Sequence, residues 1–139
     1  MSKLITHLLL IVVVCGALGG CANGAPAVDE AQATLCQRLA ELQRSVRQMA
    51  DVSAETTVSE LKALQAQLDG VVRAMRTANQ VLRQTRIDEL VAAYDNLVTT
   101  IDGLGSQERI GEARSQIQAA VAQVQTAFDQ ANAALNCNQ

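Results

Sequence analysis

The chain has 139 residues and a formal net charge of −3 at neutral pH, with four cysteines, one proline, one tyrosine, one phenylalanine and no tryptophan. This length suits one domain, and the acidic balance argues against a nucleic-acid partner. Because aromatic side chains are scarce, a pocket that stacks sugars or encloses a drug-sized molecule would be hard to build. Alanine, glutamine, leucine and valine predominate, a composition that favours long helices over sheets.

Residues 1–20 have the pattern of a bacterial export signal. Lys3 precedes the apolar run Leu8–Leu18, whose 11 residues are too few to cross a bilayer, since a spanning helix takes about 20. A run of this length at an N-terminus is typical of a signal peptide. The segment Leu18-Gly19-Gly20-Cys21 at its end resembles the lipobox of bacterial lipoproteins. The resemblance implies cleavage before Cys21, a diacylglycerol on its sulfur, and an extracytoplasmic protein anchored to a membrane.

Two alternatives to lipidation are an ordinary cleaved signal peptide with an accidental cysteine and an uncleaved membrane helix. Cys15 fits the motif less well than Cys21, because the bulky Val14 precedes it. Ala22 stands where an Asp resembles an inner-membrane retention signal, so the outer membrane is favoured in a cell that has two membranes. Cleavage also removes His7, the only histidine, and with it any imidazole for a metal, a haem or general-base catalysis.

A tether at residues 21–30 and a helical domain over residues 31–137 are expected after the signal. Thr57 and Glu60 have the spacing of a capping box, which starts a helix, and Gly103 marks a helix end. The three predicted helices cover residues 31–52, 57–102 and 106–136. The apolar stripe of the first predicted helix has heptad spacing and contains Leu35, Leu39, Leu42, Val46 and Met49. The apolar stripe of the last predicted helix contains Ile110, Ala113, Ile117, Val121, Val124, Phe128, Ala131 and Leu135.

The long helix predicted over residues 57–102 carries two apolar stripes that do not align. The segment Arg83–Arg86 separates them, and at 100° per residue they are offset by about 110°. Either the helix breaks near Thr85, which gives a four-helix up-down bundle, or it stays straight and presents two faces to two partners. No glycine or proline marks a break there.

Cys36 and Cys137 bracket the domain, and outside the cytoplasm such a pair is most simply a disulfide. Free thiols or an intermolecular bridge are the alternatives. A disulfide requires Cα atoms within about 7 Å. At 1.5 Å per residue, three antiparallel helices bring both cysteines to a height of about 45 Å, whereas four helices leave them about 35 Å apart. We therefore expect an all-α fold, an elongated antiparallel three-helix coiled-coil-like bundle, whose thin core would favour self-association.

Four arginines follow one another in the second predicted helix with no acidic residue among them: Arg73, Arg76, Arg83 and Arg86. One interpretation is a contact with an anion, either lipid headgroups or an acidic envelope polymer. The other is a solvated face, partly paired through Asp69 and Arg73 at i,i+4 and with acids of a neighbouring helix. Arg86 points nearest the apolar side and should need a partner.

The sequence predicts no catalytic residue, no metal site and no cofactor. Met49 and Met75 occupy helical stripe positions, which indicates core packing rather than soft-metal binding. The general plan is similar to that of murein-type lipoproteins, but the chain ends in Asn138-Gln139 and lacks their C-terminal lysine for wall attachment. The favoured function is a non-enzymatic scaffold or protein-interaction module of the cell envelope, which binds itself or an envelope protein. The alternative is an accessory lipoprotein that holds an apolar or anionic ligand between helices.

Overall fold

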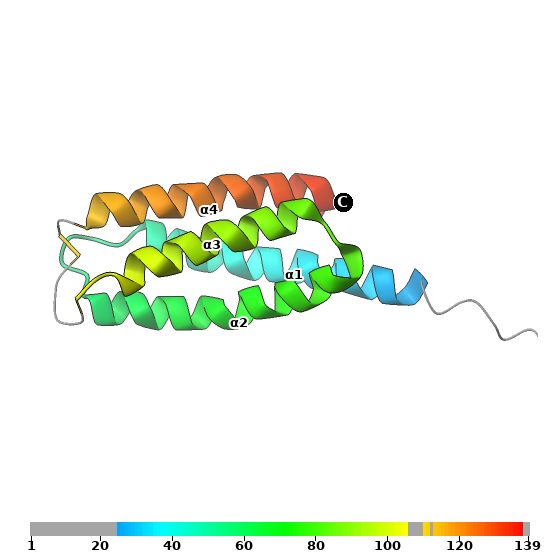
Figure 1. The fold of residues 1–139 in the computed structure, drawn as a ribbon, viewed down its shortest axis with the longest axis horizontal. Coiled ribbons are helices and arrows are strands. Elements are labelled where there is room, and N and C mark those ends of the chain that lie inside the picture. Colours follow the sequence, from blue (N-terminus) through cyan, green and yellow to red (C-terminus); the bar gives the residue numbers. More distant parts are fainter. Residues whose placement is uncertain (1–24, 106–109, 112, 138–139) are drawn as a thin grey trace, which may run out of the picture.

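The computed structural model describes residues 25–105, 110–111 and 113–137, so the signal, the lipobox and Cys21 lie outside the described part. Over these ranges the chain is all-helical, as predicted (Figure 1). The helices are α1 (Ala25–Ala50), α2 (Val58–Leu82), α3 (Thr85–Asp102) and α4 (Arg114–Leu135).

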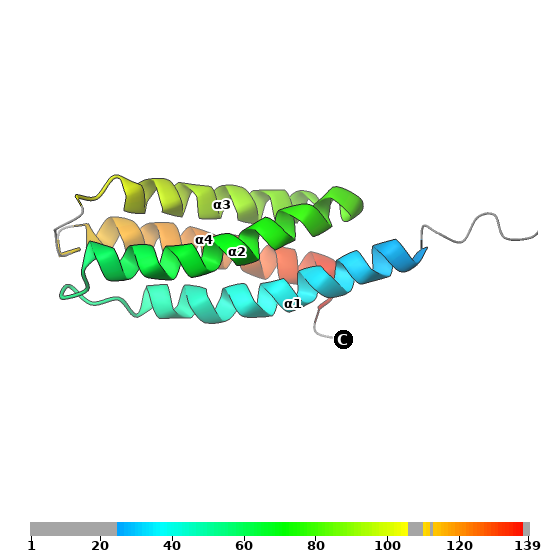
Figure 2. The ribbon, with the colours of Figure 1, turned by 90° about the horizontal axis from the view of Figure 1, so that it is seen from below.

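The helices run alternately up and down around one apolar core. α1 packs against α2 and α4, and α3 packs against the same two helices, so the four surround the core as a ring (Figures 1 and 2). The prediction of a helical bundle is confirmed. The largest side chains that it buries completely are Leu35, Leu39, Leu42, Met49, Leu61, Leu68, Met75, Ile87, Leu90, Leu97, Ile101 and Ile110.

α1 begins at Ala25, earlier than the start predicted near residue 31. Pro26 and Gly24 indicated a tether, but a proline fits the first turn of a helix, because its missing N–H would have no partner there anyway. The residues gained, 25–30, precede Ala31, which is buried against the core. The tether expected over residues 21–30 is therefore shorter than predicted.

The structure corrects the continuous helix predicted over residues 57–102. The capping box of Thr57 and Glu60 starts α2 as expected, but α2 ends at Leu82 and α3 begins at Thr85. Between them Arg83 adopts left-handed backbone angles, φ 52° and ψ 44°, without the glycine that usually takes this conformation. Both apolar stripes can therefore face the same core, because the chain reverses direction between them.

The last helix also differs from its prediction, since α4 begins at Arg114 rather than at residue 106. Seven of the eight predicted stripe residues are buried, and Ala113 is half-buried. The C-terminal cap is Asn136, a second left-handed residue (φ 53°). Ser106, the first residue of the helix predicted over 106–136, lies outside the described residues.

A disulfide joins Cys36 of α1 to Cys137 after α4, with Cα atoms 5.3 Å apart. The cysteines are close, as predicted, but the expectation that four helices would hold them about 35 Å apart was wrong. That reasoning started each helix at the height where the previous one ended. Instead, the Ile110 N–H donates to the Thr56 carbonyl at 3.1 Å, so the α3–α4 connection rises beside the α1–α2 connection. α4 then starts high enough to descend to the level of Cys36.

Loss of this disulfide should destabilise the bundle considerably. The bond spans 101 residues, and release of so long a loop in the unfolded chain should lower the free energy of unfolding by about 2–5 kcal/mol. Urea unfolding of a Cys36→Ala/Cys137→Ala variant checks this, with reduced wild-type protein as the control that should match it. An unchanged midpoint in both samples would contradict the prediction.

Candidate interaction surface at the α2–α3 turn

The four arginines singled out in the sequence divide into a paired and an unpaired set. Arg76 of α2 donates to both carboxylate oxygens of Asp95 on α3, at 2.5 and 2.7 Å. Arg86 donates to Glu89 at 2.6 Å and to Gln130 of α4 at 3.2 Å, so the partner expected for it is present. Arg76 thus pairs with an acid of a neighbouring helix, as the solvated-face interpretation supposed. Arg86 pairs with an acid of its own helix and reaches α4 through the neutral Gln130.

Arg73 and Arg83 form no ion pair with any residue in the described ranges. The pairing predicted between Asp69 and Arg73 is not formed, because Asp69 accepts the hydroxyl hydrogen of Tyr94 at 2.6 Å instead. Both guanidinium groups are exposed. They are the members of the set that remain available to an anion.

The turn that presents Arg83 is held by the side chain of Asn79, which is only 5% exposed. Its amide nitrogen donates to the Gln84 carbonyl at 3.1 Å and to Asp88 at 2.8 Å, and its amide oxygen accepts from the Gln84 N–H at 2.8 Å. The Arg83 N–H closes α2 by donating to the Asn79 carbonyl at 2.7 Å. One buried side chain thus pairs the Gln84 N–H, which the reversal would otherwise leave without a partner, and adds a donor to the Gln84 carbonyl.

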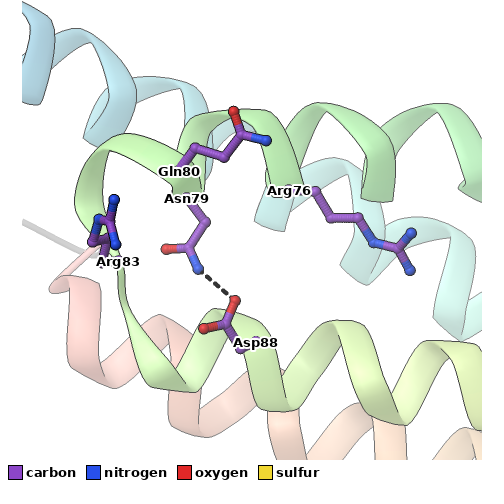
Figure 3. Close-up of a pocket in the computed structure, with 5 residues that line it drawn as sticks. All are labelled: Arg76, Asn79, Gln80, Arg83 and Asp88. Atoms are coloured by element: carbon purple, nitrogen blue, oxygen red, sulfur yellow. Dashed lines mark hydrogen bonds between the residues drawn. The ribbon is translucent and has the colours of Figure 1, made fainter.

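An open depression of about 360 Å³ lies beside this turn, lined by Arg76, Asn79, Gln80, Arg83 and Asp88. Figure 3 shows the Asn79–Asp88 hydrogen bond crossing from α2 to α3, with Arg76 on one side of it and Arg83 on the other. Because Asn79 is occupied by the turn and Arg76 by Asp95, Arg83 is the cation that can meet an approaching anion. Guanidinium groups suit phosphate and carboxylate oxygens because of their planar array of donors.

A second polar contact lies farther along the seam between α2 and α3. Tyr94 is buried, and its hydroxyl lies 2.6 Å from the Asp69 carboxylate and 3.2 Å from the Gln65 carbonyl oxygen. Burial, and then the hydrogen bond to Asp69 and the charge of Asp69, raise the pKa of the Tyr94 hydroxyl. The sequence placed Tyr94 in an apolar stripe but gave no sign of its hydrogen-bond partner, which comes from a helix on the other side of the turn.

Met49 and Met75 are fully buried in the core, as predicted. Within the described ranges, no three or more His, Cys, Asp or Glu side chains come together as a metal site. Among the described residues, no helix has both the length and the apolar character needed to cross a membrane. Comparisons with protein-family models, with curated proteins and with solved structures find no match for this chain.

Replacement of Asn79 by alanine should weaken the turn. The change removes three side-chain hydrogen bonds and leaves the Gln84 N–H unpaired, which should cost about 1–3 kcal/mol of stability. The Gln84 carbonyl keeps the backbone N–H groups of Ile87 and Asp88. Urea unfolding measures the loss, with Gln80→Ala as the matched control, since Gln80 is the exposed neighbour and should change stability by less than about 0.5 kcal/mol. Equal stability of the two variants would contradict the role given to Asn79.

The raised pKa of Tyr94 predicts a loss of stability in alkali. A raised folded-state pKa gives stability that is complete below the unfolded value, near pH 10, and that falls as the pH rises above it, because only the unfolded chain then ionises. Tyr94 is the only tyrosine, so near-ultraviolet absorbance reports its ionisation directly. It should ionise together with unfolding, and Tyr94→Phe should lose less stability above pH 10. Ionisation near pH 10 in the folded protein would contradict this.

Proposed function

We propose that this protein is a non-enzymatic, lipid-anchored module of the bacterial cell envelope, in which a rigid helical bundle acts as a scaffold or protein-interaction domain. The lipobox-like segment that ends at Cys21 supports the anchor. The Cys36–Cys137 disulfide supports the same extracytoplasmic address independently, because such bonds persist in oxidising compartments. The partner that this proposal assigns is a second copy of the chain or another envelope protein.

The observation that carries the scaffold assignment is the closed packing of the bundle. The apolar stripes of all four helices are buried in one continuous core, and the disulfide joins the first helix to the end of the last. A body held in this way keeps its shape and presents a fixed outer surface. We accordingly propose a four-helix up-down bundle as its form in solution, in place of the elongated three-helix arrangement.

The proposed anchor lies close to the bundle. Three residues lie between Cys21 and Ala25, where α1 begins, and the four Cα–Cα steps reach at most about 14 Å. The bundle would therefore stand directly on its membrane, on the extracytoplasmic side. In a cell with two membranes, Ala22 favours the outer one.

Mass spectrometry of protein purified from membranes tests the proposal. We expect a mature N-terminus at Cys21 that carries lipid, together with a Cys36–Cys137 cross-linked peptide from monomer that separates on reduction. A Cys21→Ser variant should remain unprocessed and lose the lipid. An unmodified N-terminus in the wild-type protein would contradict the anchor and place the protein among soluble secreted proteins.

The scaffold and ligand-binding alternatives are separated by assembly and by uptake of a small molecule. A scaffold with a closed core should associate reversibly as its concentration rises in analytical ultracentrifugation, and it should not take up an environment-sensitive apolar dye. Dye uptake without association would instead favour an accessory lipoprotein with a ligand between its helices.

A further inference from the structure

We propose that the α2–α3 turn rests on an anionic lipid surface, with Arg83 against headgroup phosphates and Val81 in the apolar layer just beneath them. The inference rests on the proposed lipid anchor and adds an orientation to it. The anchored protein would then contact the membrane at two places, the lipid on Cys21 and the turn.

The first reason is the position of the turn in the fold. The start of α1, the α2–α3 turn and the end of α4 lie at one end of the bundle, and the other two connections lie at the opposite end (Figures 1 and 2). The Gln32 side chain donates to the Leu135 carbonyl at 3.1 Å, which fixes the level of α1 against α4. α1 extends seven residues beyond Gln32 to Ala25, about 10 Å. A lipid on Cys21 therefore brings this end of the bundle to the membrane.

The second reason is the distribution of exposed apolar side chains. The two large hydrophobic residues that are exposed in the described part of the chain are Val28, at 41%, and Val81, at 50%. Isolated exposed valines are ordinary on protein surfaces, but both of these lie at the anchor end. Val81 is two residues from Arg83, so an apolar side chain and an unpaired cation occur together. That combination is typical of segments that lie in a membrane interface.

The third reason is the arrangement of charge at this end. The acidic groups near the turn are engaged within the bundle, since Asp88 accepts from Asn79 and Glu89 from Arg86. Asp29 of α1 lines a different depression, between α1 and the end of α4, and Glu30 follows it. Asp88 keeps its charge, since its partner is a neutral amide, so the turn with Arg83, Asp88 and the Arg86–Glu89 pair carries no net charge. The α1 side with Asp29 and Glu30 is acidic, and an anionic surface would therefore tilt the bundle toward Arg83.

The absence of tryptophan from the sequence allows a direct test with a single reporter. The mature, lipidated protein carrying Val81→Trp is reconstituted in phosphatidylcholine–phosphatidylglycerol vesicles with or without brominated acyl chains. The bromine should quench Val81→Trp at least about twofold more than Ala54→Trp, because an interfacial side chain lies within about 10 Å of the acyl boundary. Ala54 is a matched control, since it is exposed and lies in the α1–α2 connection at the far end.

Two further arms make the outcome decisive. Adding Arg83→Gln to Val81→Trp should reduce the quenching in vesicles that contain phosphatidylglycerol, and should change it little in pure phosphatidylcholine. Thr85→Trp, also exposed in the turn region, is a second reporter in case Val81→Trp disturbs folding. Protein that sediments with vesicles while turn and control reporters are quenched equally would overturn the orientation and leave the anchor intact. Protein that does not sediment at all would overturn the anchor, and the orientation with it.

Discussion

The buried amide of Asn79 is the interaction on which the arrangement of the bundle depends. A helix that reverses direction leaves backbone donors and acceptors without partners at both of its new ends, and here the side chain of Asn79 provides for the carbonyl and the N–H of Gln84. Without that provision the two apolar stripes on either side of the turn would point about 110° apart on one rod. With it, α3 folds back along α2 and both stripes enter one core.

The contacts between α1 and α4 and those between α2 and α3 are held by different means. α1 and α4 are fixed near one end by the Cys36–Cys137 bond and at the other by the hydrogen bond between their neighbouring connections. α2 and α3 are held by the turn itself, by the buried hydroxyl of Tyr94 and by the exposed pair of Arg76 and Asp95. An exposed pair contributes little to stability, so the turn and Tyr94 are the stronger contacts of this seam.

The fold was predictable to the extent that local spacing determines it. Apolar periodicity identified the helices, and the capping box marked the start of α2, because both are properties of neighbouring residues. A break near Thr85 was one of two alternatives, and it was set aside because no glycine or proline marks it and the helix lengths placed the cysteines too far apart. Its support comes from Asn79 and Asp88, on opposite sides of the turn. In the candidate site, the sequence found the four arginines. Which of them is free depends on Asp95 and Gln130, acceptors brought near only by tertiary packing.

If the chain is anchored as we propose, the position of the disulfide lets it resist a pull on the bundle. Any pull on the bundle would enter through α1, the helix that follows the lipidated residue, and a helix loaded at its end peels from its neighbours one turn at a time. Cys36 lies eleven residues into α1, so peeling would meet a covalent bond to the end of α4 before it reached most of the core. Leu39, Leu42, Val46 and Met49, all buried, lie beyond that point. The bond therefore protects the part of α1 that supplies most of its core residues.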